Sequence, residues 1–156
     1  MSVNDNLTEV LNDLIQINND RTKGYEKAAE DAKSTDVDLN ATFTKMADES
    51  RKYVAELTNE VHRLGGDAAT GTTNSGKIHR AWLEVKATFS GNDRQALLNS
   101  CEFGEDAAQK AYKNALASDA EMSAETRNLI TDQQSSLKSS HDIIKKYRDA
   151  NKALDA

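Results

Sequence analysis

The sequence predicts an all-α protein, a bundle of four long helices, and three observations carry this prediction. The 156 residues include no proline, and five of the seven glycines lie between positions 65 and 91. Both residue types interrupt helices, so their scarcity elsewhere favours long uninterrupted helices. In four stretches apolar residues recur at alternating spacings of three and four, the pattern of helices packed at a shallow angle. We expect one domain spanning residues 1–156, because this length suits a single core.

The first two predicted helices cover about residues 4–32 and 36–64. Each has a seam, meaning a stripe of inward-facing positions three or four residues apart. Ser34, Thr35 and Asp36 supply cap residues for the second helix, which we expect to end at Gly65-Gly66, where glycine can adopt the left-handed conformation. The two seams comprise Leu7, Leu11, Leu14, Asn18, Arg21, Tyr25, Ala28 and Ala32, then Leu39, Phe43, Met46, Ser50, Tyr53, Leu57 and Leu64.

The other two long helices are predicted at about residues 92–117 and 123–154. A glycine-rich connection precedes them and contains a short predicted helix at 77–89. This connection is long enough to travel the length of the bundle, so the second and third long helices can run parallel. A bundle with one long crossover is the ferritin-like arrangement. The two seams comprise Leu98, Cys101, Glu105, Ala108, Tyr112 and Ala115, then Ile130, Gln133, Leu137, Ser140, Ile144, Tyr147 and Leu154.

Composition excludes several classes of function. Lys and Arg total 20 against 26 Asp and Glu, a net charge of −6, which argues against binding of nucleic acid. No run of twenty apolar residues occurs, so we expect no membrane span. The first residues lack the pattern of a secretory signal, and the lone Cys101 cannot form an internal disulfide. We therefore expect a cytoplasmic protein.

A layer of polar residues interrupts the four seams near their centres. Aligned polar positions of this kind are what metal sites in helix bundles require. Two interpretations remain open. In one, the layer is structural, with Arg21 and Arg51 neutralising buried carboxylates, since buried charges persist only when paired. In the other, it holds a single metal ion or a small ligand. The layer comprises Asn18, Arg21, Ser50, Glu105 and Gln133, with Asp20 at the flank of the first seam.

Three segments resemble motifs of the ferritin-like superfamily. INNDRTKGY (17–25) resembles the first-helix motif, and GEDAAQKAY (104–112) resembles the third. The second-helix Glu-x-x-His segment is similar to ADESRKYVAEL (47–57), in which Ser50 corresponds to the Glu and Tyr53 to the His. Shifting this alignment by one residue places Glu49 at the position of the Glu. The fourth helix offers no Glu-x-x-His. The resemblance implies that the degenerate metal positions are Asp20, Glu49, Ser50, Tyr53, Glu105 and Gln133.

The ligand set that this resemblance implies is incomplete. In the alignment that places Ser50 at the ligand position of the second helix, only Asp20 and Glu105 are carboxylates. No histidine accompanies them. Two carboxylates cannot supply the first shell of a di-iron centre. We therefore expect no cofactor, with iron or another divalent metal as the alternative.

Three stretches carry a closer resemblance to an uncharacterised bacterial family of ferritin-like bundles with a domain of unknown function. They are NDRTKGYEKAAED (19–31), GKIHRAWLEVK (76–86) and CEFGEDAAQKAY (101–112). Related families are associated with stress responses, so the resemblance implies a stress-linked role. In the middle stretch, Trp82 is expected to pack the short helix onto the bundle. Alternatively, His79, Arg80 and Trp82 form a ligand or partner surface.

The sequence therefore favours a non-enzymatic bundle that acts as a structural or interaction protein, in the form of a homodimer. One alternative is a metal-binding protein that oxidises or stores iron. The other is a carrier that holds a small ligand in the polar layer.

Overall fold

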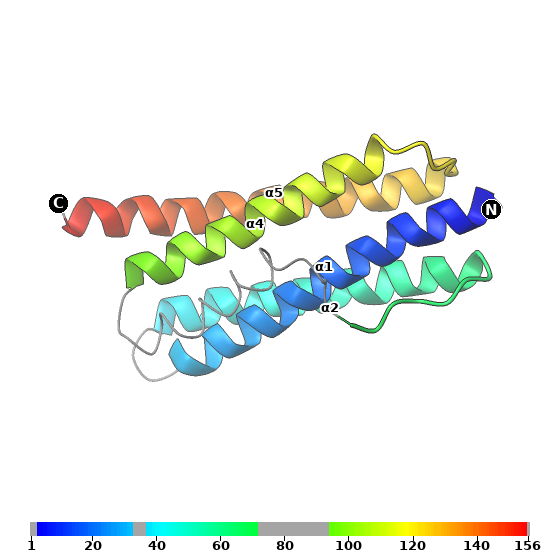
Figure 1. Ribbon diagram of the computed structural model, residues 1–156. Helices are drawn as coiled ribbons and strands as arrows, with labels where there is room; N and C mark the ends of the chain where they lie inside the picture. The colour runs from blue at the N-terminus through cyan, green and yellow to red at the C-terminus, as the bar shows by residue number, and fades with distance from the viewer. Residues whose placement is uncertain (1–2, 33–36, 72–93, 156) are drawn as a thin grey trace.

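The structure is a computed structural model, and it describes residues 3–32, 37–71 and 94–155. Within these residues the chain forms four α-helices and no strand (Figure 1). The helices are α1 (Val3–Ala32), α2 (Val37–Arg63), α4 (Arg94–Leu116) and α5 (Ala124–Asp155). The all-α four-helix prediction is confirmed, and every helix end lies within two residues of its predicted position. The short helix predicted at 77–89, with His79, Arg80 and Trp82, lies outside the described residues.

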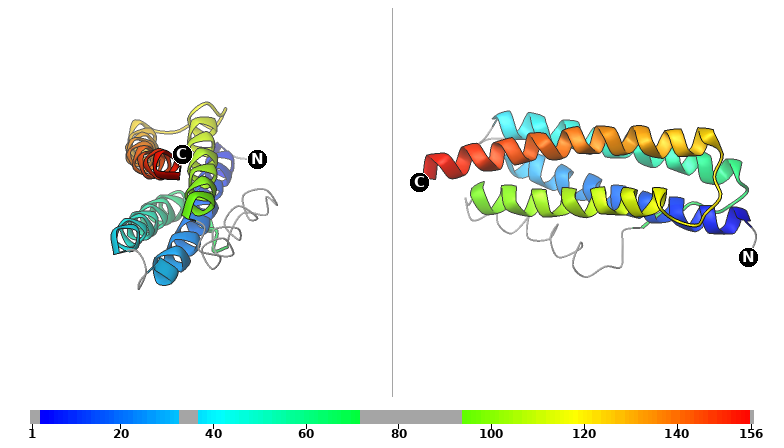
Figure 2. Two further views of the ribbon diagram at one scale, coloured as in Figure 1. Left: turned by 90° about the vertical axis from the view of Figure 1, so that its left-hand side faces the viewer. Right: turned by 90° about the horizontal axis from the view of Figure 1, so that it is seen from above.

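The four helices form two antiparallel hairpins, α1 with α2 and α4 with α5 (Figure 1). Viewed from its end, the bundle places α1 diagonally opposite α5 and α2 diagonally opposite α4 (Figure 2). Helix α2 ends at one end of the bundle and α4 begins at the other, so these two helices run in the same direction. This is the direction that the long connection in the sequence allows. None of the described helices is long and apolar enough to cross a membrane.

The core consists of two apolar clusters with polar residues between them. One cluster lies around Tyr25 and Phe43, near the start of α2 and α4, and the other around Leu11 and Leu57. Most predicted seam residues of the described helices are buried, but Leu64 is only half-buried because α2 ends at Arg63 and the seam ends at Val61. Cys101 is fully buried, as predicted, and this burial raises the pKa of its thiol, which disfavours a reactive thiolate.

A row of side-chain hydrogen bonds joins α2 to α5. Both helices contribute residues at intervals of seven, which is two helical turns, so the bonds recur along one line. We call this row the α2–α5 ladder. Its rungs are Thr42 to Tyr147 (3.3 Å), Ser140 to Glu49 (2.9 Å), Gln133 to Glu56 (3.2 Å) and Arg63 to Thr126 (3.5 Å). The hairpins are thus joined on this side by polar contacts in addition to the apolar clusters.

Helix α2 ends in a Schellman motif at Gly65. The Gly66 N–H donates to the Val61 carbonyl at 3.0 Å, and the Gly65 N–H donates to the His62 carbonyl at 3.0 Å. Gly65 has φ +79°, a conformation that side chains with a Cβ rarely adopt. The left-handed cap predicted at this position is confirmed.

We expect Gly65→Ala to lower the free energy of unfolding by about 1 kcal/mol, because alanine is strained at positive φ. Gly71→Ala is the matched control, since a Cβ there meets no atom within 4 Å and its φ is not positive. Its effect should stay within about 0.5 kcal/mol. Urea unfolding monitored by circular dichroism measures both changes. Equal effects of the two substitutions would show that the backbone of Gly65 is not strained by a Cβ.

Candidate functional site

Arg21 of α1 is the centre of the polar layer. Its side chain is fully buried, and its Nε donates to Glu105 Oε1 on α4 at 2.8 Å. Its Nη1 donates to Ser50 Oγ on α2 at 2.7 Å, and Nη2 lies 2.8 Å from Glu105 Oε1. A buried charge is stable only when it is paired and hydrogen-bonded, and Arg21 meets both conditions. One guanidinium therefore connects three of the four helices.

Tyr25 completes the surroundings of the ion pair. Its hydroxyl donates to Glu105 Oε1 at 2.8 Å, and the guanidinium carbon of Arg21 lies 5.5 Å from the centre of its ring. Burial, together with the Glu105 carboxylate, raises the pKa of Tyr25 well above its usual value, so the hydroxyl keeps its proton. Burial alone would lower the pKa of Arg21, but Glu105 outweighs it and the pKa is raised. The group is thus a guanidinium cation, a carboxylate anion and a neutral phenol.

A second set of hydrogen bonds, which begins at Asn18 and ends at the carboxylate of Glu56, runs beside the ion pair. Asn18 Nδ2 on α1 donates to the Tyr112 hydroxyl on α4 at 2.8 Å. That hydroxyl donates to Gln133 Oε1 on α5 at 2.6 Å, and Gln133 Nε2 donates to Glu56 on α2 at 3.2 Å. Burial raises the pKa of Tyr112, so this phenol also remains protonated. The chain of bonds passes through all four helices and fixes them at one level.

Four buried side-chain atoms of α1 and α4 make no hydrogen bond within the part of the chain that the structure describes. They are Asn18 Oδ1, Glu105 Oε2, Gln109 Nε2 and Arg21 Nη2, the last of which is in ion-pair contact with Glu105 only. Buried donors and acceptors are normally all paired. Three of these four atoms belong to Asn18, Arg21 and Glu105, which the described hydrogen bonds of the layer already connect.

The structure joins five of the predicted site residues through hydrogen bonds, and it shows where three others lie. Tyr53 is buried, and its backbone carbonyl lies 3.5 Å from Gln133 Nε2. Glu49 is half-buried and accepts from Ser140 in the α2–α5 ladder. Asp20 is buried in α1, one residue before Arg21. The residues that meet in the layer are Asn18, Arg21, Ser50, Glu105 and Gln133.

Arg51 does not lie in the polar layer, contrary to the sequence prediction. Its side chain is 47% exposed and pairs with Glu26 and with Asp48, the latter at 2.5 Å. The reason is helical geometry, since Ser50 lies on the seam of α2 and the next residue is turned about 100° away from it. Arg21 alone supplies the buried cation among the described residues.

The sequence prediction did not include the two tyrosines in the polar layer. Tyr25 and Tyr112 were placed on the apolar seams, where their rings lie, but their hydroxyls carry three of the bonds that connect the layer. The positions of the two tyrosines relative to charged residues on the same helix could have indicated their role. Tyr25 follows Arg21 by four residues and Tyr112 follows Glu105 by seven, so each lies on the same helix face as a charged residue.

Comparison with known proteins gives one family. The sequence model of a family described as a domain of unknown function (DUF2383) matches residues 6–118. The match includes α2, nearly all of α1 and the whole of α4, and with them the ion pair and its two partners, Tyr25 and Ser50. It ends before α5, which contributes Gln133 to the layer. No curated protein matches the chain significantly.

Proposed function

The chain belongs to this family of unknown function, and we propose that it is a ferritin-like bundle that works without metal redox chemistry. In this proposal it is a structural or interaction protein of the bacterial cytoplasm, linked to stress and able to associate with itself. The common direction of α2 and α4 supports the ferritin-like topology. The observation that carries the functional part is the position of the Arg21 guanidinium.

Arg21 supplies a positive charge where a di-iron bundle holds its metal ions. The guanidinium bonds to two positions that the ferritin resemblance assigns to metal ligands, Glu105 and Ser50. Any divalent cation bound to Glu105 at this level would lie beside that guanidinium, and like charges so close in a buried site repel strongly. The described hydrogen bonds of this region involve the carboxylates of Glu105 and Glu56 together with hydroxyls and amides, and none of these bonds includes a histidine. Iron sites in bundles use several carboxylates and imidazoles instead.

Iron addition tests the proposal directly. Protein purified without chelator is mixed with Fe²⁺ in air-saturated buffer, and oxygen consumption is followed with an electrode. We expect uptake equal to that of buffer with Fe²⁺ alone, because the layer already contains its cation. Uptake above the buffer rate would overturn the proposal. Loss of that extra uptake in Glu105→Gln, but not in His141→Ala, would then place the iron in the polar layer.

A further inference from the structure

A second group of charged side chains lies between α4 and α5, apart from the polar layer. Glu102 and Asp106 are one helical turn apart on α4, and His141 faces them from α5. His141 Nε2 lies 2.6 Å from Asp106 Oδ1 and 4.0 Å from Glu102 Oε1. One ligand atom of each residue lies within 4.8 Å of the other two. The side chains of Glu102 and His141 are only 15% and 17% exposed. The geometry thus brings two carboxylates and an imidazole to one point.

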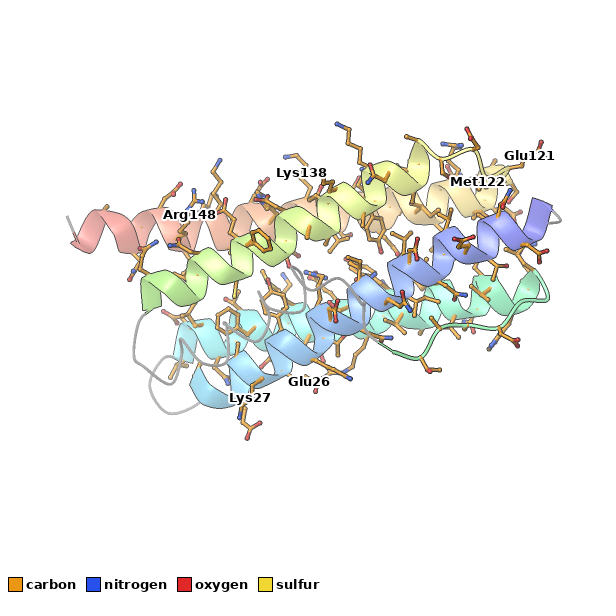
Figure 3. All side chains as sticks on the ribbon, viewed as in Figure 1. Glu26, Lys27, Glu121, Met122, Lys138 and Arg148 are labelled. Carbon is orange, nitrogen blue, oxygen red and sulfur yellow. The ribbon has the colours of Figure 1, made fainter. Side chains whose placement is uncertain are left out.

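The neighbouring charges leave these three ligand atoms available. Arg148 pairs with Glu102 through Oε2, which leaves Oε1 directed toward His141. Lys138 pairs with Asp142 at 3.3 Å and not with Glu102 or Asp106. Both cations belong to α5, on the side of the bundle away from α1 and α2 (Figure 3). Arg148 also pairs with Asp149, so four carboxylates lie among two cations, and this excess of negative charge favours a metal cation.

We propose that Glu102, Asp106 and His141 form a binding site for Zn²⁺ or a similar divalent transition metal. His141 would bind through Nε2 and each carboxylate through one oxygen. Zinc bonds of about 2.0–2.2 Å hold neighbouring ligand atoms roughly 3–3.5 Å apart. The separations of 2.6 and 4.0 Å from Nε2 lie on either side of that value, so small side-chain rotations suffice. Three protein ligands leave the fourth position of zinc to water.

Asp142 provides the supporting contact that metal-bound histidines usually have. When Nε2 binds a metal, the proton of the ring resides on Nδ1, and a carboxylate commonly accepts it. Asp142 Oδ1 lies 3.5 Å from His141 Nδ1. Nδ1 is thus the ring nitrogen that faces Asp142, while Nε2 faces Asp106 on α4. Since the ligands come from both helices, bound metal would tie α4 to α5, a role that goes beyond the function proposed for the polar layer.

Titration of the metal-free protein with ZnCl₂, followed by isothermal calorimetry, tests this site. We expect one equivalent of Zn²⁺ to bind and the melting temperature to rise, because a ligand that binds only the folded state stabilises it. His141→Ala and Asp106→Ala should each abolish the stoichiometric binding, and Asp142→Asn should weaken it by roughly 10- to 100-fold. His62→Ala is the matched control, since this exposed histidine belongs to α2.

Three results would overturn the proposal. The first is the absence of a one-equivalent site in the wild-type protein. The second is binding that His141→Ala leaves unchanged, and the third is binding that His62→Ala removes. Asp106 is 64% exposed, so Asp106→Ala should fold and keeps the test valid even if His141→Ala does not. A failure here leaves the function proposed for the polar layer unaffected, because the oxygen measurement concerns iron at Glu105.

Discussion

Arg21→Met is expected to lower the free energy of unfolding by about 3–5 kcal/mol, the usual result of leaving one member of a buried ion pair without its partner. Methionine is apolar and cannot neutralise a carboxylate. Glu105 would keep the hydrogen bond from Tyr25 but lose its counter-ion in a fully buried position. Urea unfolding monitored by circular dichroism measures the change. A second effect is expected on Ser50, whose hydroxyl would lose its bond to the guanidinium.

Arg51→Met is the matched control for this prediction. Arg51 makes ion pairs as Arg21 does, but its side chain is 47% exposed. Exposed ion pairs contribute about 0–1 kcal/mol, so the control should cost no more than that. The double variant Arg21→Met with Glu105→Leu should recover most of the loss, because it removes both buried charges. If Arg21→Met costs as little as Arg51→Met, the Arg21–Glu105 pair is not buried in solution.

Phe43→Ala is expected to cost about 3–5 kcal/mol, since truncating a fully buried phenylalanine leaves a cavity in a core that cannot fully collapse. Phe43 is 0% exposed, and the centre of its ring lies 5.7 Å from that of Tyr25. The substitution also removes a support of the ring whose hydroxyl donates to Glu105. The substitution should therefore weaken the hydrogen bond between Tyr25 and Glu105 in the polar layer, as well as the packing of the apolar cluster. Urea unfolding again measures the change.

Phe103→Ala on α4 is the matched control, because Phe103 is 44% exposed. Much more of this side chain than of Phe43 already lies in water, so its truncation should cost about 1 kcal/mol, well below the cost of Phe43→Ala. A cost for Phe103→Ala close to that of Phe43→Ala would contradict the burial difference between the two rings. The comparison thus tests the orientation of α4 in the bundle.

The sequence could predict the helices and most of the polar layer because both follow from spacing along a single helix. Predicting the end of α2 at Gly65 required only the conformational preference of glycine. Arg21, Ser50 and Glu105 were found because polar residues interrupt apolar seams. The prediction for Arg51 was wrong because it relied on the charge of the residue, whereas the position next to Ser50 already turned the side chain outward.

The group around His141 could not be predicted in the same way. Glu102 and Asp106 share a face of α4 because they are four residues apart, and this much is visible in the sequence. Which residue of α5 faces them depends on how far the two helices are shifted along their axes. That shift results from the turn between them and from packing across the whole bundle. A residue pattern on one helix contains no information about it.

Because the rungs of the α2–α5 ladder recur every seven residues, the ladder alone does not determine how far α5 is displaced along α2. A displacement of α5 by seven residues would bring Thr42 opposite Ser140, Glu49 opposite Gln133 and Glu56 opposite Thr126, again pairing donors with acceptors. The side chains of the ladder are therefore compatible with a second alignment, in which three of the four rungs would be replaced by other pairs. The Arg21–Glu105 pair joins α1 to α4, so a sliding of one hairpin along the other would separate two buried charges. We expect the ion pair to favour one position of the hairpins relative to each other, in addition to its effect on stability.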